Sequence, residues 1–232
     1  MMRFKEEIQQ RFTARHKRSL DFAGNLKDKV ILDIGCSIGW FEKFAIGKGC
    51  LRIVGMDLCE NNLSNAVLQV NHERAKFLKG SALDLSAFGE DVFDVVVMWE
   101  VMEHLPFNAE QKSLKEVARV LKSSGVLFVS VPNKSFWSCA LDPAWYLGHR
   151  HYSRKCVSTI FSKSGFIIEK VEYGGAFFEL FSMFLLYIFK WLLRQELPFK
   201  GWFEKKREEE YFNDQGFVNL FLKASKPQLT KT

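Results

Sequence analysis

The sequence predicts an α/β fold with a seven-stranded, mostly parallel sheet and helices on both of its faces. Three observations lead to this prediction. Short apolar runs alternate with helical patterns along the chain, as they do in proteins with parallel sheets. The run at 93–99 is apolar almost throughout, which is typical of a strand covered on both faces. A turn with two glycines, within 30–44, joins the first run to a helical pattern, as in an opening βα unit.

The first half of the chain alternates regularly between the two patterns. Strands are expected at 29–34, 51–57, 76–80 and 93–99. Helices are expected at 4–24, 40–48 and 61–70. Gly24 and Gly49 end the first two of these helices, since glycine favours the backbone angles that follow a helix.

The second half continues the alternation with longer connections. Strands are expected at 126–131, 166–173 and 217–223, and helices at 109–121 and 153–164. Leu114, Val117 and Leu121 fall on one face of the helix at 109–121. A turn is expected at 123–125 and an extended loop after Pro132, because proline ends the strand.

Length and composition indicate a globular protein with one domain and an elaboration. The chain has 232 residues, of which 47% are hydrophobic and 26% charged. Its segments are expected to be an N-terminal helical segment (1–27), a core (28–175), a hydrophobic helical insertion (176–215), and a last strand with a tail (216–232).

The net charge and the cysteine pattern indicate which partners and which cellular compartment to expect. A formal charge of +6 fits an anionic membrane surface, a phosphate-bearing substrate or simply solvated faces. The five cysteines include no C-x-x-C pair, which argues against a disulfide framework and a zinc site and favours a reducing cytoplasm. The first 18 residues are charged throughout, unlike a secretory signal.

Several motifs along the chain, taken in order, resemble those of a known protein family. Residues 32–39 read LDIGCSIG, Asp57 ends the second strand 22 residues after Gly35, and Glu103-His104-Leu105 follows the fourth strand. In this order the motifs resemble the class I S-adenosylmethionine-dependent methyltransferases, in particular the group with ubiquinone-pathway O-methyltransferases, over about 28–223. The glycine spacing fits the G-x-G-x-x-G of a dehydrogenase poorly. The resemblance implies a Rossmann-like sheet whose last strand is antiparallel, with the helical insertion before it.

The resemblance also implies the cofactor S-adenosyl-L-methionine, the product S-adenosyl-L-homocysteine, and a set of cofactor-binding positions. These are Asp33, Gly35, Cys36, Ser37, Gly39, Asp57, Leu58, Ser81, Ala82, Leu83 and Trp99. Ser37 stands where the family often has a glycine, which is tolerable if its backbone angles are ordinary. Ser81 stands where many relatives carry an acid toward the adenine, so backbone N–H groups would have to replace that contact.

Three of these residues also have a structural interpretation. The Asp57 carboxylate would accept both ribose hydroxyl hydrogens, or else cap a helix. Asp33 would hold the glycine loop and help position the amino-acid part of the cofactor, or else bond backbone amides at a strand end. Trp99 would line the pocket at the methionine end of the cofactor, or else belong to the hydrophobic core.

His104 is the candidate catalytic base, because an oxygen acceptor needs a group that takes its proton. The alternative is a histidine bonded to a backbone carbonyl. Glu100, Glu103 and His104 also form E-x-x-E-H, a pattern with which some ubiquinone-pathway O-methyltransferases and small-RNA 3′-end 2′-O-methyltransferases hold a divalent metal. The same carboxylates can instead cap the next helix, so metal ligands stay unassigned.

Four polar residues precede the helix at 153–164 and are candidates for substrate binding: His149, Arg150, His151 and Tyr152. Loops after parallel strands open on the cofactor edge of the sheet, so these side chains would meet an acceptor with phosphate, carboxylate or sugar hydroxyls. A second role open to either histidine is to complete a metal site. The alternative is a solvated helix start at Ser153.

The insertion is apolar almost all round over 176–193, interrupted by Glu179, Ser182 and Lys190. It borders on the length of a membrane span, but a span would leave the last strand on the far side, so an interfacial or packed helix is expected. The sequence therefore predicts a hydrophobic roof over the acceptor pocket, with peripheral membrane contact through 176–207. The alternative is packing on the domain or on a second subunit.

Together these features predict a cytoplasmic methyltransferase that acts on a small-molecule, lipid-like or lipid-linked acceptor, at oxygen in the favoured version. One alternative is an RNA 3′-end 2′-O-methyltransferase, although no basic and aromatic nucleic-acid surface stands out and no nucleic-acid partner is expected. The other alternative is a non-catalytic scaffold that keeps the cofactor. The oligomeric state stays open.

Overall fold

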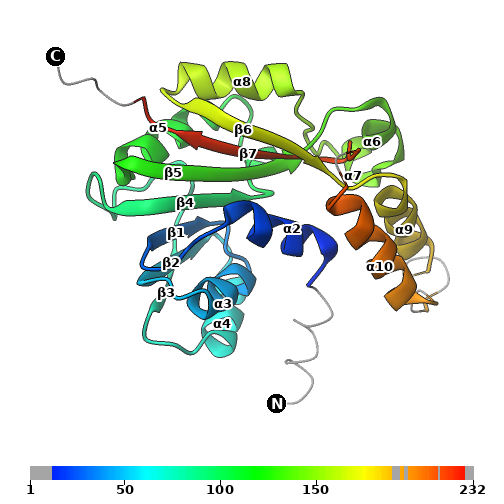
Figure 1. Cartoon of the computed structure of the whole chain (residues 1–232), viewed down its shortest axis with the longest axis horizontal. Helices are drawn as coiled ribbons and strands as arrows, with labels where there is room; N and C mark the ends of the chain where they lie inside the picture. The colour runs from blue at the N-terminus through cyan, green and yellow to red at the C-terminus, as the bar shows by residue number, and fades with distance from the viewer. Residues whose placement is uncertain (1–11, 190–193, 196–197, 214, 228–232) are drawn as a thin grey trace.

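The protein is a seven-stranded sheet between helical layers (Figure 1). The computed structural model describes residues 12–227 except 190–193, 196–197 and 214. The strands are β1 (Val30–Ile34), β2 (Arg52–Asp57), β3 (Ala75–Lys79), β4 (Phe93–Trp99), β5 (Leu121–Pro132), β6 (Ile167–Gly174) and β7 (Asn219–Ser225). The helices are α2 (Ala14–Ala23), α3 (Trp40–Gly47), α4 (Glu60–Gln69), α5 (Glu110–Val120), α6 (Phe136–Leu141), α7 (Pro143–Tyr146), α8 (Arg154–Lys163), α9 (Phe177–Tyr187) and α10 (Lys200–Tyr211), with a 3₁₀ turn, η1 (Met102–His104).

The strand order is β3-β2-β1-β4-β5-β7-β6, and β7 runs antiparallel to both of its neighbours. The predicted fold class is therefore confirmed, including the antiparallel last strand and the helical insertion before it. β1 pairs with β2 on one side and β4 on the other, both parallel. The strand order therefore reverses its direction at β1. In open α/β sheets, ligands bind at the carboxyl ends of the strands at such a point.

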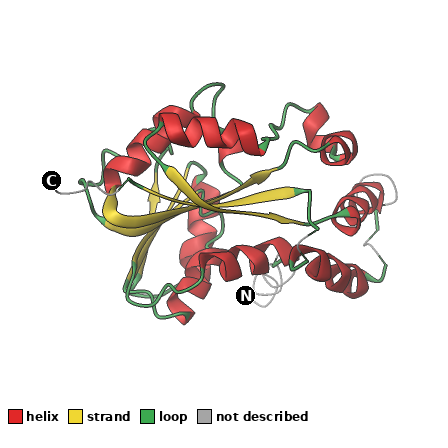
Figure 2. Ribbon diagram, turned by 45° about the horizontal axis from the view of Figure 1, so that its top comes forward, coloured by secondary structure: helices red, strands yellow, loops and turns green. Residues whose placement is uncertain are grey.

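Helices cover both faces of the sheet (Figure 2). Successive residues of β1 show why: Ile31 packs in a cluster with Phe22 of α2 and Phe41 of α3, whereas Leu32 packs in the opposite cluster. That second cluster includes Leu114 of α5 and residues of α8. Because side chains alternate along a strand, a strand buried on both faces must be apolar almost throughout.

Two local predictions are wrong. The turn expected at 123–125 lies inside β5, where the pairing with β4 shifts register between Phe93 and Val95. The expected loop after Pro132 contains two helices, α6 and α7. Both are too short to show a period, and each depends on one cap: the Ser135 hydroxyl accepts from the Ser138 N–H at 3.1 Å, and Asp142 accepts from the Ala144 N–H at 2.9 Å.

The insertion forms two helices, α9 and α10, that lie side by side (Figure 1). The apolar helix expected over 176–193 is described as α9 up to Tyr187, and its end at 190–193 lies outside the described residues. Likewise, α2 is the described part of the helix expected over 4–24. Among the described helices, none combines the length and apolar character that a bilayer crossing requires.

Candidate active site

The glycine loop after β1 is held by close backbone packing. Gly35 and Gly39 have φ angles of 80° and 82°, which glycine adopts without strain. A Cβ at Gly35 would lie 2.5 Å from Cγ2 of Val101, so the loop also touches the chain after β4. The Gly35 N–H donates to the Met56 carbonyl at 2.7 Å, which ties the loop to β2.

Ser37 is the strained point of this loop. Its φ is 49°, in the left-handed region, so the sequence-based condition of ordinary backbone angles is not met. The Ser37 N–H donates to Oδ2 of Asp57 at 2.9 Å, and Oδ1 of Asp57 accepts from the Cys59 N–H at 2.8 Å. The left-handed turn thus points a backbone donor at the carboxylate that ends β2, and strain of this kind clusters at ligand sites.

A first cavity of about 430 Å³ opens at the carboxyl ends of β1, β2 and β4. It contains Asp57 and six other predicted cofactor residues, which are Gly35, Ser37, Leu58, Ser81, Ala82 and Leu83 in the order of the chain. Its other wall consists of Glu100, Val101, His104, Leu105 and Pro106. The Ser81 hydroxyl accepts from the Leu83 N–H at 3.2 Å, so this serine shapes the loop after β3. Asn62 also lines the cavity, and the sequence analysis missed it.

Three further predicted cofactor residues lie outside the cavity lining. Asp33, Cys36 and Gly39 line neither this cavity nor the neighbouring one. Asp33 is buried, and burial raises its pKa to about 8 although the neighbouring Glu42 side chain opposes this shift. Burial and the nearby Asp33 also raise the pKa of Glu42. Two buried carboxyls thus lie side by side next to the glycine loop in the sequence.

A second cavity of about 260 Å³ lies on the other side of the loop and shares Gly35, Ser37 and Glu100 with the first. Its wall includes Trp99, as predicted for a residue at the end of β4, together with Arg15 of α2. The sequence analysis missed Arg15, because its contacts lie far along the chain and leave no local pattern.

Arg15 is held in this cavity by a network around Glu100. Nη1 of Arg15 donates to Oε2 of Glu100 at 2.9 Å, and the Ser130 hydroxyl donates to Oε1 of Glu100 at 2.7 Å. Nδ2 of Asn219 also donates to Oε2, at 3.0 Å. Glu100 has a φ of 55°, and these three donors hold its carboxylate away from the E-x-x-E-H cluster.

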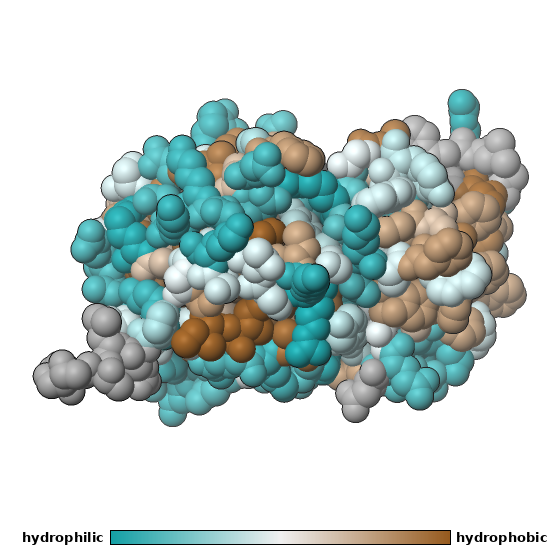
Figure 3. Space-filling view, turned by 90° about the horizontal axis from the view of Figure 1, so that it is seen from above, coloured by the Kyte–Doolittle hydropathy of each residue, from teal (hydrophilic) through white to brown (hydrophobic). Residues whose placement is uncertain are grey.

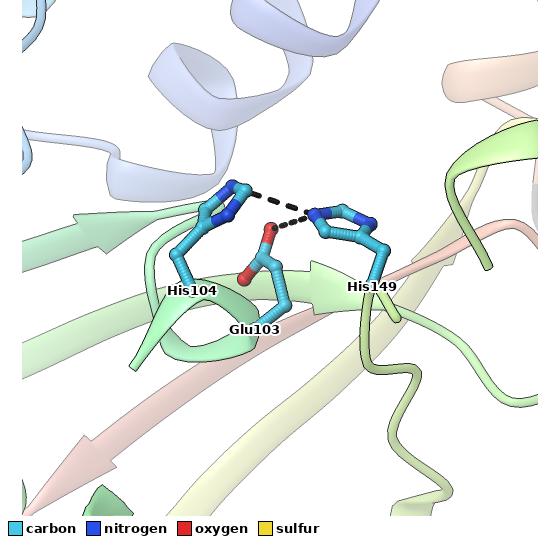
Figure 4. A group of neighbouring side chains, drawn as sticks. All are labelled: Glu103, His104 and His149. Atoms are coloured by element: carbon cyan, nitrogen blue, oxygen red, sulfur yellow. Dashed lines mark hydrogen bonds and ion pairs between the residues drawn. The ribbon is translucent and has the colours of Figure 1, made fainter. Parts of the chain in front are cut away.

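The other two members of that motif meet a histidine from the segment after α7 (Figure 4). Nε2 of His149 lies 3.4 Å from Nε2 of His104 and 4.0 Å from Oε1 of Glu103. Both Glu103 oxygens and Nδ1 of His149 are buried with no hydrogen-bond partner among the described residues. Burial raises the pKa of Glu103, with a contribution from Glu100, and burial and His104 lower the pKa of His149. The cluster therefore has the donors and the unmet bonding capacity that suit a divalent cation.

The remaining predicted substrate-binding residues make structural contacts. Nη2 of Arg150 donates to the Met102 carbonyl at 2.8 Å, and the Tyr152 hydroxyl donates to the same carbonyl at 3.0 Å. Nε2 of His151 lies 3.0 Å from Oδ2 of Asp142. These side chains fix η1 and the α6–α7 segment, so an acceptor-binding role for them stays a prediction.

The known proteins that resemble this chain agree with the geometry. Residues 32–129 match the methyltransferase domain family. Together with the fold, this match supports a class I S-adenosylmethionine-dependent methyltransferase. The matched segment runs from β1 into β5 and holds the first cavity, the glycine loop and His104.

Individual relatives of this methyltransferase are distant. The ubiquinone biosynthesis O-methyltransferase of Neisseria meningitidis is 29% identical over 119 residues, which are 50% of this chain and 49% of the relative. That of Coxiella burnetii is 28% identical over 113 residues, 48% of this chain and 47% of the relative. The chain thus spans about half the length of these curated relatives. The S-adenosylmethionine-dependent methyltransferase of Mesorhizobium loti has the same fold, with a TM-score of 0.65 at 16% identity over 91% of this chain and 97% of that one.

Proposed function

We propose that this methyltransferase transfers the methyl group of S-adenosyl-L-methionine to a hydroxyl oxygen of a small, lipid-like or lipid-linked acceptor. One observation carries the proposal: a single cavity at the switch point of the sheet joins Asp57, at the end of β2, to His104, after β4. Asp57 would recognise the hydroxyls of a nucleoside, and His104 would accept a proton at the other end. The O-methyltransferase names of the curated relatives support oxygen as the acceptor atom.

The two cavities suggest how the cofactor would lie. The adenosine part would occupy the first cavity, with its ribose hydroxyls on Asp57 and its adenine beside Leu58 and the loop 81–83. The amino-acid part would pass Gly35 into the second cavity, where the Arg15 guanidinium would receive its carboxylate. Trp99 would then wall the methionine end.

The chemistry is an in-line displacement at the methyl carbon. The acceptor oxygen forms a bond to this carbon while the carbon–sulfur bond breaks, and its electron pair stays on sulfur to give S-adenosyl-L-homocysteine. The positioning of the two reactants supplies much of the rate. The hydroxyl proton passes to His104 when no cation is present.

Glu103, His104 and His149 would hold a divalent cation, since the carboxylate is otherwise buried without a partner. When bound, such a cation lowers the pKa of a hydroxyl that it contacts. His104 would act on the acceptor hydroxyl in both cases, directly as the base without a cation or indirectly as a ligand of the cation. A calorimetric titration with Mn²⁺ or Zn²⁺ tests the cluster without any acceptor: binding lost in His149→Ala supports the cation, and no binding to wild type leaves His104 as the base.

The acceptor class follows from the apolar insertion. A lipid-like acceptor would be met at a bilayer, so the proposal includes a cytoplasmic location and the peripheral membrane contact expected through 176–207. The same insertion would roof the acceptor pocket, as the sequence predicts.

The test of the proposed function begins with cofactor binding. Wild type should bind S-adenosylmethionine and S-adenosylhomocysteine in a calorimetric titration, Asp57→Ala should lose this binding, and the matched variant Asp21→Ala, at an exposed aspartate of α2, should keep it. Methyl transfer is then measured as release of S-adenosylhomocysteine with phenolic and hydroxylated lipid acceptors. A folded wild type that binds neither compound overturns the proposal.

A second candidate function shares the cofactor and the histidine cluster. The sequence analysis associated the E-x-x-E-H motif with RNA 3′-end 2′-O-methylation, and two of its residues, Glu103 and His104, belong to the cluster with His149. Salt-dependent RNA binding, with methyl transfer to RNA and none to lipids, would favour this function. Cofactor binding without transfer to any acceptor would favour the scaffold.

A further inference from the structure

We propose that α6, α7, α9 and the start of α10 form one surface that docks on an anionic lipid bilayer. This surface deepens the membrane contact of the proposed function and adds a segment, 136–147, that the sequence analysis treated as loop. It is named here the docking surface. Its exposed large apolar residues are Phe136, Trp137, Leu141, Tyr146, Leu147, Phe177, Phe181, Phe184, Leu186, Phe199 and Trp202.

Helix α9 buries Glu179 and Ser182 beside Leu180 and exposes phenylalanines on its outer side. Glu179 is buried and pairs with Arg207 of α10, with Nη2 donating to Oε1 at 2.9 Å. Phe177, Phe181 and Phe184, which recur at helical spacing, are 55%, 51% and 49% exposed. A surface helix in water normally shows the reverse arrangement, so the environment expected outside α9 is apolar.

The apolar residues are continuous across the helices. Trp137 of α6 lies 5.9 Å from Phe177 of α9, between ring centroids, and Phe178 of α9 lies 5.6 Å from Trp202 of α10. A groove of about 320 Å³ runs between Leu141 and the α9 phenylalanines. Figure 3 shows apolar side chains gathered at the end of the molecule that carries these helices. The exposed apolar residues therefore extend over several helices, and a surface of this extent suits contact with a bilayer.

Charge complementarity identifies the occupant as a bilayer with anionic lipids. The carboxylates described in 135–147, α9 and α10 all have cationic or N–H partners; they are Asp142, Glu179, Glu204, Glu208, Glu209 and Glu210. Beside the docking surface, Lys134, Arg194 and Lys200 are exposed. The surface therefore presents apolar rings with a basic margin, the composition of helices that lie in the headgroup region.

The docking surface is connected along the chain to the histidine cluster, since the segment 143–147 leads directly to His149. At its other end, Phe177 packs on Phe217 with ring centroids 5.0 Å apart. On the proposed function, a lipid-like acceptor would reach the site from the side of the bilayer.

The test is cosedimentation of the full chain with vesicles of phosphatidylcholine alone or mixed with phosphatidylglycerol. Wild type should bind the mixed vesicles more tightly, and salt should weaken this binding. Phe177→Ser with Phe181→Ser should reduce the affinity by roughly tenfold or more, because each ring loses apolar burial. The matched control is Val67→Ser with Leu68→Ser, since both residues are exposed on α4, which packs on β2 and β3 at the other end of the sheet. Lys134→Glu with Lys200→Glu should remove the preference for anionic vesicles.

Three results would overturn the inference: no vesicle binding by wild type, equal binding by the phenylalanine variant, or a dimer that this variant abolishes while vesicles stay unbound. The last would assign the docking surface to a second copy of the chain. Binding of S-adenosylhomocysteine by each variant is measured separately, so failure of docking is distinguished from failure of the proposed reaction.

Discussion

Around the first cavity, polar side chains line an open pocket, whereas on the docking surface the carboxylates have partners and aromatic rings are exposed. The cavity side contains left-handed Ser37 and Glu100 and the buried Asp33. The docking side contains unstrained α9, whose Glu179 is paired with Arg207. The segment that matches the methyltransferase family, 32–129, covers the cavity side and ends before α6. On the proposed function, the matched segment would bind the cofactor, and the docking surface outside it would select the acceptor and the location.

The largest expected effect tests whether the two regions are independent. Arg207→Met should lower the free energy of unfolding by about 3–5 kcal/mol, because it leaves the Glu179 carboxylate buried without its charge partner. The affinity for S-adenosylhomocysteine should stay within about twofold, since Arg207 lines neither cavity. Chemical denaturation and calorimetry measure the two quantities. The double variant Glu179→Leu with Arg207→Met should recover most of the stability, and a parallel loss of affinity would show that the regions act as one.

Arg15 lies where the cavity side meets the rest of the fold, and it gives the next largest effect. Arg15→Met should weaken S-adenosylhomocysteine binding roughly tenfold to a hundredfold, the range for a hydrogen bond to a charged group. The matched control, Arg18→Met, removes an arginine of the same helix that pairs with Asp21 and Glu172 outside the cavities. Equal losses in both variants would assign the effect to α2 stability rather than to cofactor contact.

The sequence predicted the cavity side better than the docking side, for a physical reason. The glycine loop, Asp57 and His104 are each marked by the end of a buried strand, which has a clear local pattern. Arg15 instead acts through Glu100, 85 residues away, and α6 and α7 have six and four residues and depend on caps. Contacts made by tertiary packing leave no periodic signal.

The same reasoning explains the histidine cluster. E-x-x-E-H suggested Glu100 as a ligand, but its left-handed backbone and the donors from Arg15 and Ser130 direct its carboxylate elsewhere. His149 takes the adjacent place because Arg150 fixes its segment on η1. The motif in the sequence indicated the types of residue in the cluster, and the tertiary structure determines which of these residues lie close together.

The buried carboxyls of the cavity side should make stability depend on pH. The pKa of Asp33 is raised from 3.8 to about 8, so between these values the folded state binds more protons than the unfolded state. Stability should therefore fall as the pH rises through this window. Asp33→Asn should make the fall shallower, and denaturation midpoints across the window measure it. Asp84→Asn removes an exposed carboxyl whose pKa is lowered, and should leave the fall in place.

The smallest effect concerns the strain at Ser37. Ser37→Gly should raise the free energy of unfolding by about 0.5–1 kcal/mol, because glycine relieves the left-handed penalty but loses more entropy on folding. Ser37→Val should lower it, since a β-branched side chain fits φ 49° poorly. Both variants keep the N–H that donates to Asp57, so Ser37→Gly should bind S-adenosylhomocysteine as wild type does. A weaker affinity in Ser37→Gly would mean that the strained serine itself preorganises the loop for the cofactor.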